Sequence, residues 1–419
     1  MKNALYAQAG GVTAVINASA AGVIETARRH SEQIGTVFAA RRGIFGIWDE
    51  ELIDTAAEDP DEIARLRATP GGAFGSCRYD VRTIDEDPAL YARIFEVFAA
   101  HDIGYFFYNG GNGSMDTAWK LDQAARKMGY PLISIGVPKT MDNDLLLTDC
   151  CPGFGSVAKY IATSIREVGL DLAAMVQGKP KVFVMEVMGR NAGWVAASSA
   201  LAKEAEDDAP HIVLLPEVAF DHEAFLARVR EIAGRLGYCA VVVSEGIKGQ
   251  DGRFLSERQV EHGYVQLGGA GEALTQLISR RLGFKYHLAI VDYLQRSARH
   301  LASRTDVEQA YGAGRAAVEF ALAGLSGVMP AVHRLADSPY RWEIQPLSLQ
   351  DIGNAERRLP PEFIRADGFG LTEAFRRYAL PLIAGEEAPE FRDGLPRFAR
   401  LALRPVPKLC PPPAYPLPL

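Results

Sequence analysis

The sequence predicts an α/β protein made of two Rossmann-like, three-layer lobes, whose mostly parallel sheets face each other across an active-site cleft. Apolar runs of strand length alternate with helical patterns along most of the chain, and the runs fall into two groups. This alternation is typical of parallel sheets joined by helical crossovers. Glycine turns or charged residues follow several of the runs, and such strand ends are where α/β proteins bind ligands.

The composition limits the class of protein. The 419-residue chain is long enough for two domains, and its 48% hydrophobic and 23% charged content is that of a soluble globular protein. The formal net charge of −7 argues against a nucleic-acid partner, and five scattered cysteines indicate reduced thiols. The first strand leaves no room for a signal sequence, and no apolar run reaches roughly 18 residues. We therefore expect a cytoplasmic protein without a membrane partner.

The first predicted strand covers residues 5–9 and is followed by Gly10 and Gly11, then by a helical pattern of small residues over 15–27. A glycine turn before a helix can hold an anion on free backbone amides. The same turn can also be a packing device that needs glycine for its positive φ. Both interpretations stay open for this turn taken alone.

A second strand over residues 35–40 precedes a glycine-rich loop, residues 70–78, that ends in Arg78. A guanidinium fork binds phosphate oxygens bidentately and keeps its charge, so Arg78 is suited to span two phosphate groups. The alternative is a mobile surface loop.

The third strand, residues 103–108, runs into Asn109-Gly-Gly-Asn-Gly-Ser114 and a further helical pattern. We expect Ser114 to cap that helix and the glycines to form a second cradle for phosphate. Two such cradles, together with the acidic turn that follows the next strand, predict a polyphosphate site.

That acidic turn follows the apolar run 131–137 and brings Lys139, Thr140, Asp142 and Asp144 together. The two carboxylates alternate around one residue, so they would face the same side of an extended segment. One could then take a proton while the other orients a metal, with Lys139 set against an anion. The alternative is a turn that merely closes a strand.

A second group of strands is predicted over residues 182–187, 212–216 and 240–245. Arg190 follows the first of these and is placed for an anion, and Glu245 ends the last and is placed for sugar hydroxyls. Ordinary capping would explain either residue. Residues 293–300 gather three basic side chains, those of Arg296, Arg299 and His300. Two strand groups with separate anion sites indicate two lobes and a cleft.

We expect residues 1–157, with part of 300–350, to form a phosphoryl-donor lobe and residues 158–300 to form a sugar-phosphate lobe. Residues 351–419 would be a C-terminal extension that ends in a proline-rich tail from Arg404 onward. We expect this tail to hang free, the alternative being that it docks on a neighbouring subunit.

The motifs in this order resemble the phosphofructokinase family, and most of all its bacterial pyrophosphate-dependent members. The resemblance covers roughly residues 1–330 and rests on six stretches, Gly10-Gly11, Gly110-Gly-Asn-Gly-Ser114, Pro138-Lys-Thr-Met-Asp-Asn-Asp144, Met188-Gly-Arg190, Glu245 and Gln295-Arg296. It implies reversible phosphoryl transfer from pyrophosphate to the 1-hydroxyl of fructose 6-phosphate, a glycolytic reaction, in a homodimer or homotetramer whose sites are completed across an interface.

The resemblance also implies roles for particular residues. Asp142 would be the base for the sugar 1-hydroxyl, Arg78 would bridge donor and acceptor phosphates, and Lys181 would reach a neighbouring subunit's 6-phosphate. The implied catalytic residues are Asp142, Arg78, Thr140 and Lys139. The implied donor site is Gly11, Gly111, Asn112, Gly113, Ser114 and Lys139. The implied sugar-phosphate site is Thr140, Asp142, Lys181, Met188, Gly189, Arg190, Glu245, Tyr293 and Arg296. Asp144 and Asn112 would hold the cofactor Mg²⁺.

The donor is the harder inference. In the family a lysine at the position of Lys139 goes with pyrophosphate, because it fills the space of a nucleotide's α-phosphate. Gly113 departs from the acidic residue usual in pyrophosphate members and would leave room for a nucleotide. Ile44, near where ATP enzymes place an aromatic residue, favours pyrophosphate again. We expect pyrophosphate, with an ATP-dependent 6-phosphofructokinase as the alternative.

Two functions of other classes fit the sequence less well. A dinucleotide enzyme would show Gly-x-Gly-x-x-Gly after its first strand, and the residues after Gly10 lack that spacing. A noncatalytic sugar-phosphate sensor would tolerate loss of the base, whereas Asp142, Asp144 and Arg78 are all present. The sequence therefore favours an enzyme.

Overall fold

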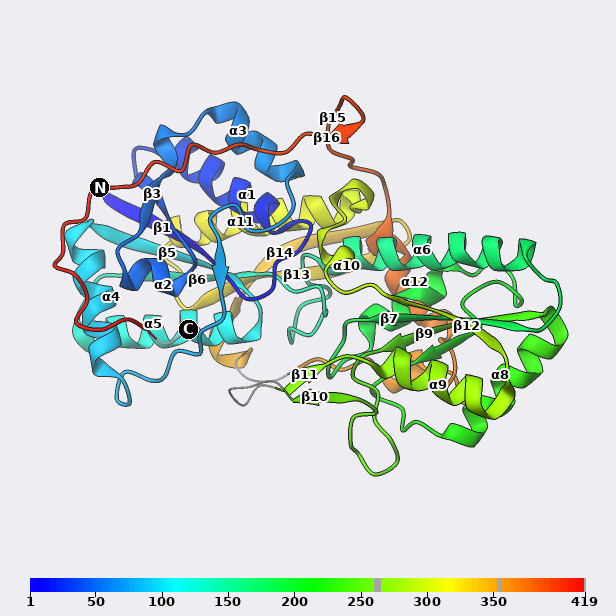
Figure 1. Ribbon diagram of the computed structural model, residues 1–419. Coiled ribbons are helices and arrows are strands. Elements are labelled where there is room, and N and C mark those ends of the chain that lie inside the picture. Colours follow the sequence, from blue (N-terminus) through cyan, green and yellow to red (C-terminus); the bar gives the residue numbers. More distant parts are fainter. Residues whose placement is uncertain (260–264, 353–355, 418–419) are drawn as a thin grey trace.

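The computed structural model describes residues 1–259, 265–352 and 356–417. It contains two lobes, each built on its own sheet with helices on both faces (Figure 1). The larger lobe, on the left in Figure 1, carries both ends of the chain. The predicted α/β class and two-lobe arrangement are confirmed.

The larger lobe is organised around an eight-stranded sheet of order β14-β13-β6-β5-β1-β2-β3, with β4 also paired to β1. Its central pairs are parallel, and the outer pairs β13–β14 and β2–β3 are antiparallel. The strands are β1 (Lys2–Ala9), β2 (Ile34–Ala40), β3 (Leu52–Asp54), β4 (Ser76–Cys77), β5 (Ile103–Gly110), β6 (Ile133–Pro138), β13 (Val328–Asp337) and β14 (Tyr340–Ser348). Chain segments before and after the smaller lobe thus share one sheet.

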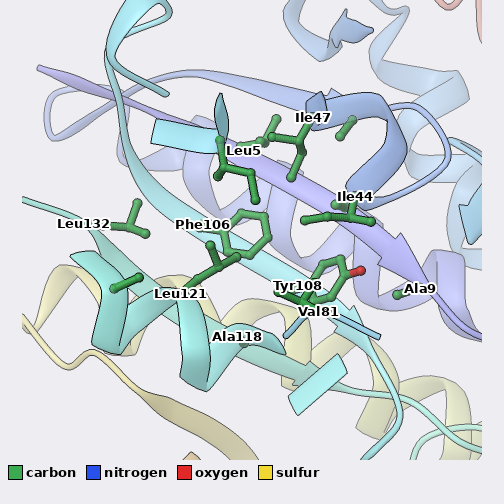
Figure 2. Close-up of a cluster of buried hydrophobic side chains, with 14 of the residues drawn as sticks. Leu5, Ala9, Ile44, Ile47, Val81, Phe106, Tyr108, Ala118, Leu121 and Leu132 are labelled. Carbon is green, nitrogen blue, oxygen red and sulfur yellow. The ribbon is translucent and has the colours of Figure 1, made fainter. Parts of the chain in front are cut away.

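Both faces of this sheet are buried, because alternate side chains of the central strands enter different cores. Leu5 and Phe106 join one core, drawn in Figure 2, and Tyr6 and Phe107 join the other. The first core lies under α2 (Ile44–Trp48), α4 (Pro88–Ala100) and α5 (Asn112–Met128), and the second under α1 (Ile16–Arg29), α3 (Pro60–Arg65) and α11 (Arg304–Leu322). Such near-continuous apolar strands are expected where helices cover both faces of a parallel sheet.

The smaller lobe is organised around a four-stranded sheet of order β12-β7-β9-β8, in which all pairs are parallel. Its strands are β7 (Lys181–Val187), β8 (Ile212–Leu214), β9 (Tyr238–Ser244) and β12 (Lys285–Ile290). One face packs on α8 (His222–Leu236) and α9 (Ala270–Leu282), and the other on α6 (Phe154–Ala174) and α7 (Trp194–Ser198). The pair β10 (Glu257–Gln259) and β11 (Val265–Leu267) and the short helix α10 (Leu294–Ser297) complete it. Within the described ranges, no helix is long and apolar enough to span a membrane.

The C-terminal extension touches both lobes. Its first part carries α12 (Glu373–Ala379) and packs Leu359 and Phe375 into the core that also contains α6 and α7. It then passes through β15 (Phe391–Arg392) and β16 (Leu395–Pro396) and returns along the larger lobe, as the red segment of Figure 1 shows.

The prediction that the proline-rich tail hangs free is wrong over the residues that are described, up to Leu417. The amide of Val406 donates to Leu52 O over 2.8 Å, and the indole Nε1 of Trp48 donates to Tyr415 O over 2.8 Å. Leu417 is buried in the same core as Leu5 and Phe106. The apolar residues spaced between the prolines therefore find sites on the same chain. The last two residues, 418–419, lie outside the described residues.

Candidate active site

A cleft with a volume of about 920 Å³ lies between the two lobes. It is lined at the carboxyl ends of β1, β5 and β6 from the larger lobe and of β7, β9 and β12 from the smaller. The predicted site residues that line it are Gly11, Arg78, Gly111, Asn112, Gly113, Ser114, Lys139, Thr140, Asp142, Asp144, Met188, Arg190, Glu245, Tyr293 and Arg296. The structure thus brings together predicted site residues that are up to 285 positions apart in the sequence, from Gly11 to Arg296.

The acidic turn follows β6 directly, but it is not extended. Asn143 is fully buried and has a φ of 54°, in the left-handed region that asparagine tolerates better than most residues. Asp142 and Asp144 therefore both line the cleft because the backbone turns sharply between them. The two carboxylates do lie on one side, as expected, but the expected reason was wrong because the segment between them is a sharp turn and not an extended strand.

Burial and mutual repulsion raise the proton affinity of both carboxyl groups. The pKa of Asp142 is raised to about 7 by burial, by Asp144 and by Glu245, while Lys139 opposes the shift. Burial is also the main cause that raises the pKa of Asp144, against a hydrogen bond from Thr140. A carboxyl group that titrates near neutrality is suited to general-base chemistry.

Lys139 is the buried cation of the turn, with 3% of its surface exposed. Its Nζ donates to Gly11 O over 2.5 Å, which ties the acidic turn to the first glycine turn. Burial lowers the pKa of this amine to about 8, and Asp142 and Asp144 oppose that shift. The amine is therefore charged at neutral pH and lies between the two carboxylates and the glycine turn.

Two buried oxygens in the same place have no partner within the described residues. Asn112 Nδ2 donates to Asp144 Oδ2 over 3.0 Å, and this leaves Asn112 Oδ1 and Asp144 Oδ1 without a hydrogen bond. The described residues contain no group of three His, Cys, Asp or Glu side chains arranged as a metal cage. Mg²⁺ prefers oxygen ligands and is commonly held by one or two protein groups plus substrate phosphates and water. The pair of oxygens fits that requirement.

The two glycine turns differ from the predicted cradles. The amide of Gly10 donates to Cys77 O over 2.8 Å, so it is not available to an anion. At the second turn, α5 begins at Asn112 with Gly111 as its N-cap, so Ser114 lies inside the first helical turn and does not cap it. A Cβ on Gly110 would lie 2.0 Å from the Ser114 hydroxyl, which leaves no room for a side chain there.

Two guanidinium groups from opposite lobes meet above Gly11. A Cβ on Gly11 would lie 2.9 Å from Arg296 Nη1 and 3.5 Å from Arg78 Nη2. Arg78 is placed by β4, whose pairing with β1 continues the glycine-rich loop into the sheet. Arg296 is held with its guanidinium 3.7 Å from the ring centre of Tyr293. The cleft therefore concentrates positive charge where the lobes approach each other.

The smaller lobe contributes a backbone turn and a buried carboxyl group. Gly189 has a φ of 142°, and a Cβ there would lie 2.9 Å from Ser244 Oγ. The amide of Gly189 donates to Glu245 Oε1 over 3.4 Å, and the amide of Met188 donates to Gln295 Oε1 over 3.3 Å. Burial raises the pKa of Glu245, and the hydrogen bond from Gly189 opposes the shift.

Three basic residues do not join the cleft of their own chain. Lys181 begins β7, a strand of seven residues that reaches the cleft only at its other end, and its Nζ donates to Met175 O over 2.6 Å. Arg299 is buried and donates to Arg67 O and Glu387 O, so it ties chain segments together. His300 is exposed and does not line the cleft. The inference that residues 293–300 gather three basic groups for a ligand is therefore wrong for Arg299 and His300.

Some cleft residues were missed by the sequence analysis. Asp80 Oδ1 lies 3.6 Å from where a Gly113 Cβ would be, which brings a carboxylate over the space that Gly113 leaves open. Glu356 lines the cleft and accepts from Asn191 Nδ2 over 3.1 Å. The acidic residue two positions after Arg78 was a usable signal for Asp80, whereas Glu356 has no local motif.

Comparison with known proteins gives one consistent result. The family model named phosphofructokinase matches residues 3–321. The chain is 57% identical to the pyrophosphate–fructose 6-phosphate 1-phosphotransferase of Methylococcus capsulatus over 97% of both chains. It is 54% identical to the enzyme of the same name from Xanthomonas campestris, over 95% of this chain and 96% of that one. A solved pyrophosphate-dependent phosphofructokinase from Marinobacter aquaeolei superposes with a TM-score of 0.91 at 53% identity, covering 98% of this chain and 99% of that one.

Proposed function

The chain belongs to the phosphofructokinase family, and from this premise we propose that it transfers a phosphoryl group from pyrophosphate to the 1-hydroxyl of fructose 6-phosphate. The products are fructose 1,6-bisphosphate and phosphate, and the reaction is the reversible phosphofructokinase step of glycolysis. The observation that carries the proposal is the turn that places Lys139, Asp142 and Asp144 in the cleft between the lobes. Phosphoryl transfer needs positioning and neutralised charge more than covalent chemistry.

On the donor side, Lys139 and Arg78 neutralise the pyrophosphate. Lys139 occupies the space between the glycine turn and the carboxylates, where a nucleotide's α-phosphate would otherwise extend. Arg78 bridges the donor and acceptor phosphates, and Thr140 contacts the transferring group. Gly11, Gly111, Gly113 and Ser114 shape the surface against which the donor lies.

On the acceptor side, Asp142 takes the proton from the sugar 1-hydroxyl as that oxygen attacks the phosphoryl group. The residues that bind fructose 6-phosphate are Met188, Gly189, Arg190, Glu245, Tyr293 and Arg296. Glu245 accepts from sugar hydroxyls, and the arginines bind phosphate through charge-assisted hydrogen bonds. The division into a donor side and an acceptor side is supported by the origin of the six fructose 6-phosphate residues, which all come from the smaller lobe.

Asp144 and Asn112 are the residues that would hold Mg²⁺, through the two oxygens that lack protein partners. When bound, the ion neutralises charge on the phosphate oxygens. Asp144 would carry the larger part of this binding because no carboxylate stands at position 112 or 113.

The assembly that we propose is a homodimer or homotetramer in which Lys181 reaches the 6-phosphate bound by a neighbouring subunit. Lys181 lies away from its own cleft, and Lys285 stands opposite it in register on β12. A cytoplasmic location agrees with five cysteines that form no disulfide, all with thiol pKa values raised chiefly by burial.

The proposal is tested by comparing donors with the purified protein. With fructose 6-phosphate and Mg²⁺, pyrophosphate should support turnover and ATP should support little or none. Asp142→Asn separates an enzyme from a sensor, because it should keep sugar-phosphate binding while kcat falls by roughly 10² to 10⁴. Fructose 6-phosphate binding without turnover under either donor would support the sensor instead.

A further inference from the structure

The acidic turn and the residues after it have little secondary structure of their own. Residues 139–149 contain no helix and no named strand, and both Asn143 and Leu147 have left-handed backbones, with φ of 54° and 61°. Backbone carbonyls in such a segment have no ladder partners, so they need donors from elsewhere. In this chain the donors come from the C-terminal extension, beyond residue 321, where the family match ends.

Arg357 supplies most of those donors. Its amide donates to Asp144 O over 2.8 Å, and its Nε donates to Asn143 O over 3.1 Å. Its Nη1 donates to Thr148 O and Asp149 O over 2.5 and 2.7 Å. The guanidinium lies 4.6 Å from the ring centre of Trp194. The rigid, planar guanidinium binds three carbonyls of this segment and the backbone amide binds a fourth, and together these bonds fix the course of the turn.

Tyr378 binds the same segment through its hydroxyl group, which contacts the side chain of Asn143. Its hydroxyl donates to Asp149 O over 2.6 Å and accepts from Asn143 Nδ2 over 3.0 Å. Arg357 Nη2 reaches the same hydroxyl over 3.3 Å. The tyrosine ring packs on Trp194 and Phe363, with centroid distances of 5.4 and 5.6 Å. The buried Asn143 is therefore hydrogen-bonded through its backbone carbonyl to Arg357 and through its side chain to Tyr378.

We propose that Arg357 and Tyr378 are positioning residues for the reaction, which set where the carboxylates on either side of Asn143 point. This inference rests on the proposed function and deepens it. Neither residue lines the cleft, so neither touches substrate. Loss of their bonds would let the left-handed turn relax, and Asp142 and Asp144 would move relative to Lys139 and Asn112. Displacement of a reacting group by about 1 Å can cost on the order of 100-fold in rate.

The expected signature is a loss of kcat with little change in sugar binding. Arg190, Glu245 and Arg296 belong to other loops, so KM for fructose 6-phosphate should stay within about threefold while kcat falls about 10-fold to 100-fold. The Mg²⁺ concentration for half-maximal rate should rise, because Asp144 would move away from Asn112, its partner in the proposed metal site.

The test compares Arg357→Lys and Tyr378→Phe with Arg358→Lys as the matched control, since Arg358 is the exposed neighbour of Arg357. All are assayed as full-length protein against wild type for kcat, KM and Mg²⁺ dependence, with Tm measured alongside. Tyr378→Phe removes one oxygen and decides the question should Arg357→Lys fail to fold.

The expected result is a reduced kcat and a raised Mg²⁺ requirement, with KM for fructose 6-phosphate within about threefold of wild type, in Arg357→Lys or Tyr378→Phe and not in Arg358→Lys. A lowered Tm with wild-type kcat and Mg²⁺ dependence would show a purely structural role and overturn the inference. Wild-type protein without pyrophosphate-dependent turnover would instead contradict the proposed function, so the two failures are distinguishable.

Discussion

Burial shifts the pKa values of Asp142 and Lys139 in opposite directions, because it disfavours the charged form of each group. It raises the pKa of Asp142 to about 7 and lowers the pKa of Lys139 to about 8. The proposed reaction needs the carboxyl group of Asp142 ionised and the amine of Lys139 protonated. The rate should therefore rise with pH through about 7 and fall above about 8. In the pH profile of kcat/KM, Lys139→Arg should keep the acid limb and lose the alkaline limb. A rate that is flat across both limbs would contradict these roles.

The raised pKa of Asp142 also has a cost in stability. Between its ordinary value of 3.8 and its folded value of about 7, the folded state binds the proton that the unfolded state has lost, so stability falls as pH rises through that window. Asp142→Asn cannot ionise, so its Tm should exceed that of wild type above pH 7 and match it near pH 4. Thermal melts at both pH values check this. A lower Tm for the variant at the higher pH would contradict it.

Arg190 and Arg296 should not behave alike, although both were predicted from the sequence as sugar-phosphate ligands. Arg296 Nη1 reaches the space over Gly11 beside Arg78, on the donor side. Arg190→Ala should raise KM for fructose 6-phosphate alone, by roughly 30-fold to 150-fold for a lost charge-assisted bond of about 2 to 3 kcal/mol. Arg296→Ala should raise KM for both substrates. Steady-state kinetics with each substrate varied in turn distinguish the two, and a donor KM unchanged in Arg296→Ala would remove that residue from the donor side.

At the scale of elements, the returning tail is anchored by a buried carboxylate. Glu50, 1% exposed, accepts from the amides of Leu409 and Cys410 and lies 2.7 Å from His101 Nε2. Glu50→Gln should lower the free energy of unfolding by about 1 to 3 kcal/mol, because it weakens bonds to a buried charged acceptor. Denaturant unfolding measures the change.

The neighbouring Glu51 provides the control for that experiment. Its ion pair with Arg42 lies at the surface, where the two side chains are 33% and 47% exposed. Glu51→Gln should therefore change stability by less than about 1 kcal/mol. Equal losses for Glu50→Gln and Glu51→Gln would show that the tail is not held through Glu50.

Strands and strand-end motifs could be predicted from sequence because their signals are local. The runs that became β1, β5, β6, β7 and β9 are apolar on both faces and end in glycine or charge. What could not be predicted depends on distant partners. The left-handed Asn143 is held by Tyr378, 235 residues away, and Arg299 is taken up by carbonyls from Arg67 and Glu387. The tail binds to residues of α2 and β3, which lie far earlier in the sequence.

At the scale of the molecule, the cleft between the two lobes brings together the residues from which the donor was inferred. The sequence left pyrophosphate in doubt because Gly113 opens space, but Asp80 brings a carboxylate to that space from another loop. The expectation of a pyrophosphate-dependent enzyme is confirmed by relatives that match both lobes and the extension at 57% and 54% identity. Under the proposed function, Lys139 and Asp80 are the two cleft residues that would oppose a nucleotide.

Lys139→Gly should therefore cost pyrophosphate turnover heavily. The change removes a charge-assisted contact near the reacting centre, worth roughly 30-fold to 150-fold. It also removes the cation that opposes the raised pKa of Asp142, so the acid limb should move to higher pH. The loss of turnover and the shift of the acid limb are both tested by measuring the rate against pH, with pyrophosphate and with ATP as the donor. Gly113→Asp serves as the comparison and should keep pyrophosphate activity, and an unchanged profile in Lys139→Gly would exclude the lysine from the donor site.

The reverse reaction tests the central claim most directly. Fructose 1,6-bisphosphate, inorganic phosphate and Mg²⁺ are supplied to the purified protein, and the pyrophosphate and fructose 6-phosphate that form are measured. Because a phosphoryl group passes between an anhydride of two phosphates and a sugar, we predict that both products appear together, at a rate comparable to the forward one. Absence of pyrophosphate under these conditions, with ATP formed when ADP replaces phosphate, would contradict the account and assign the nucleotide as the donor.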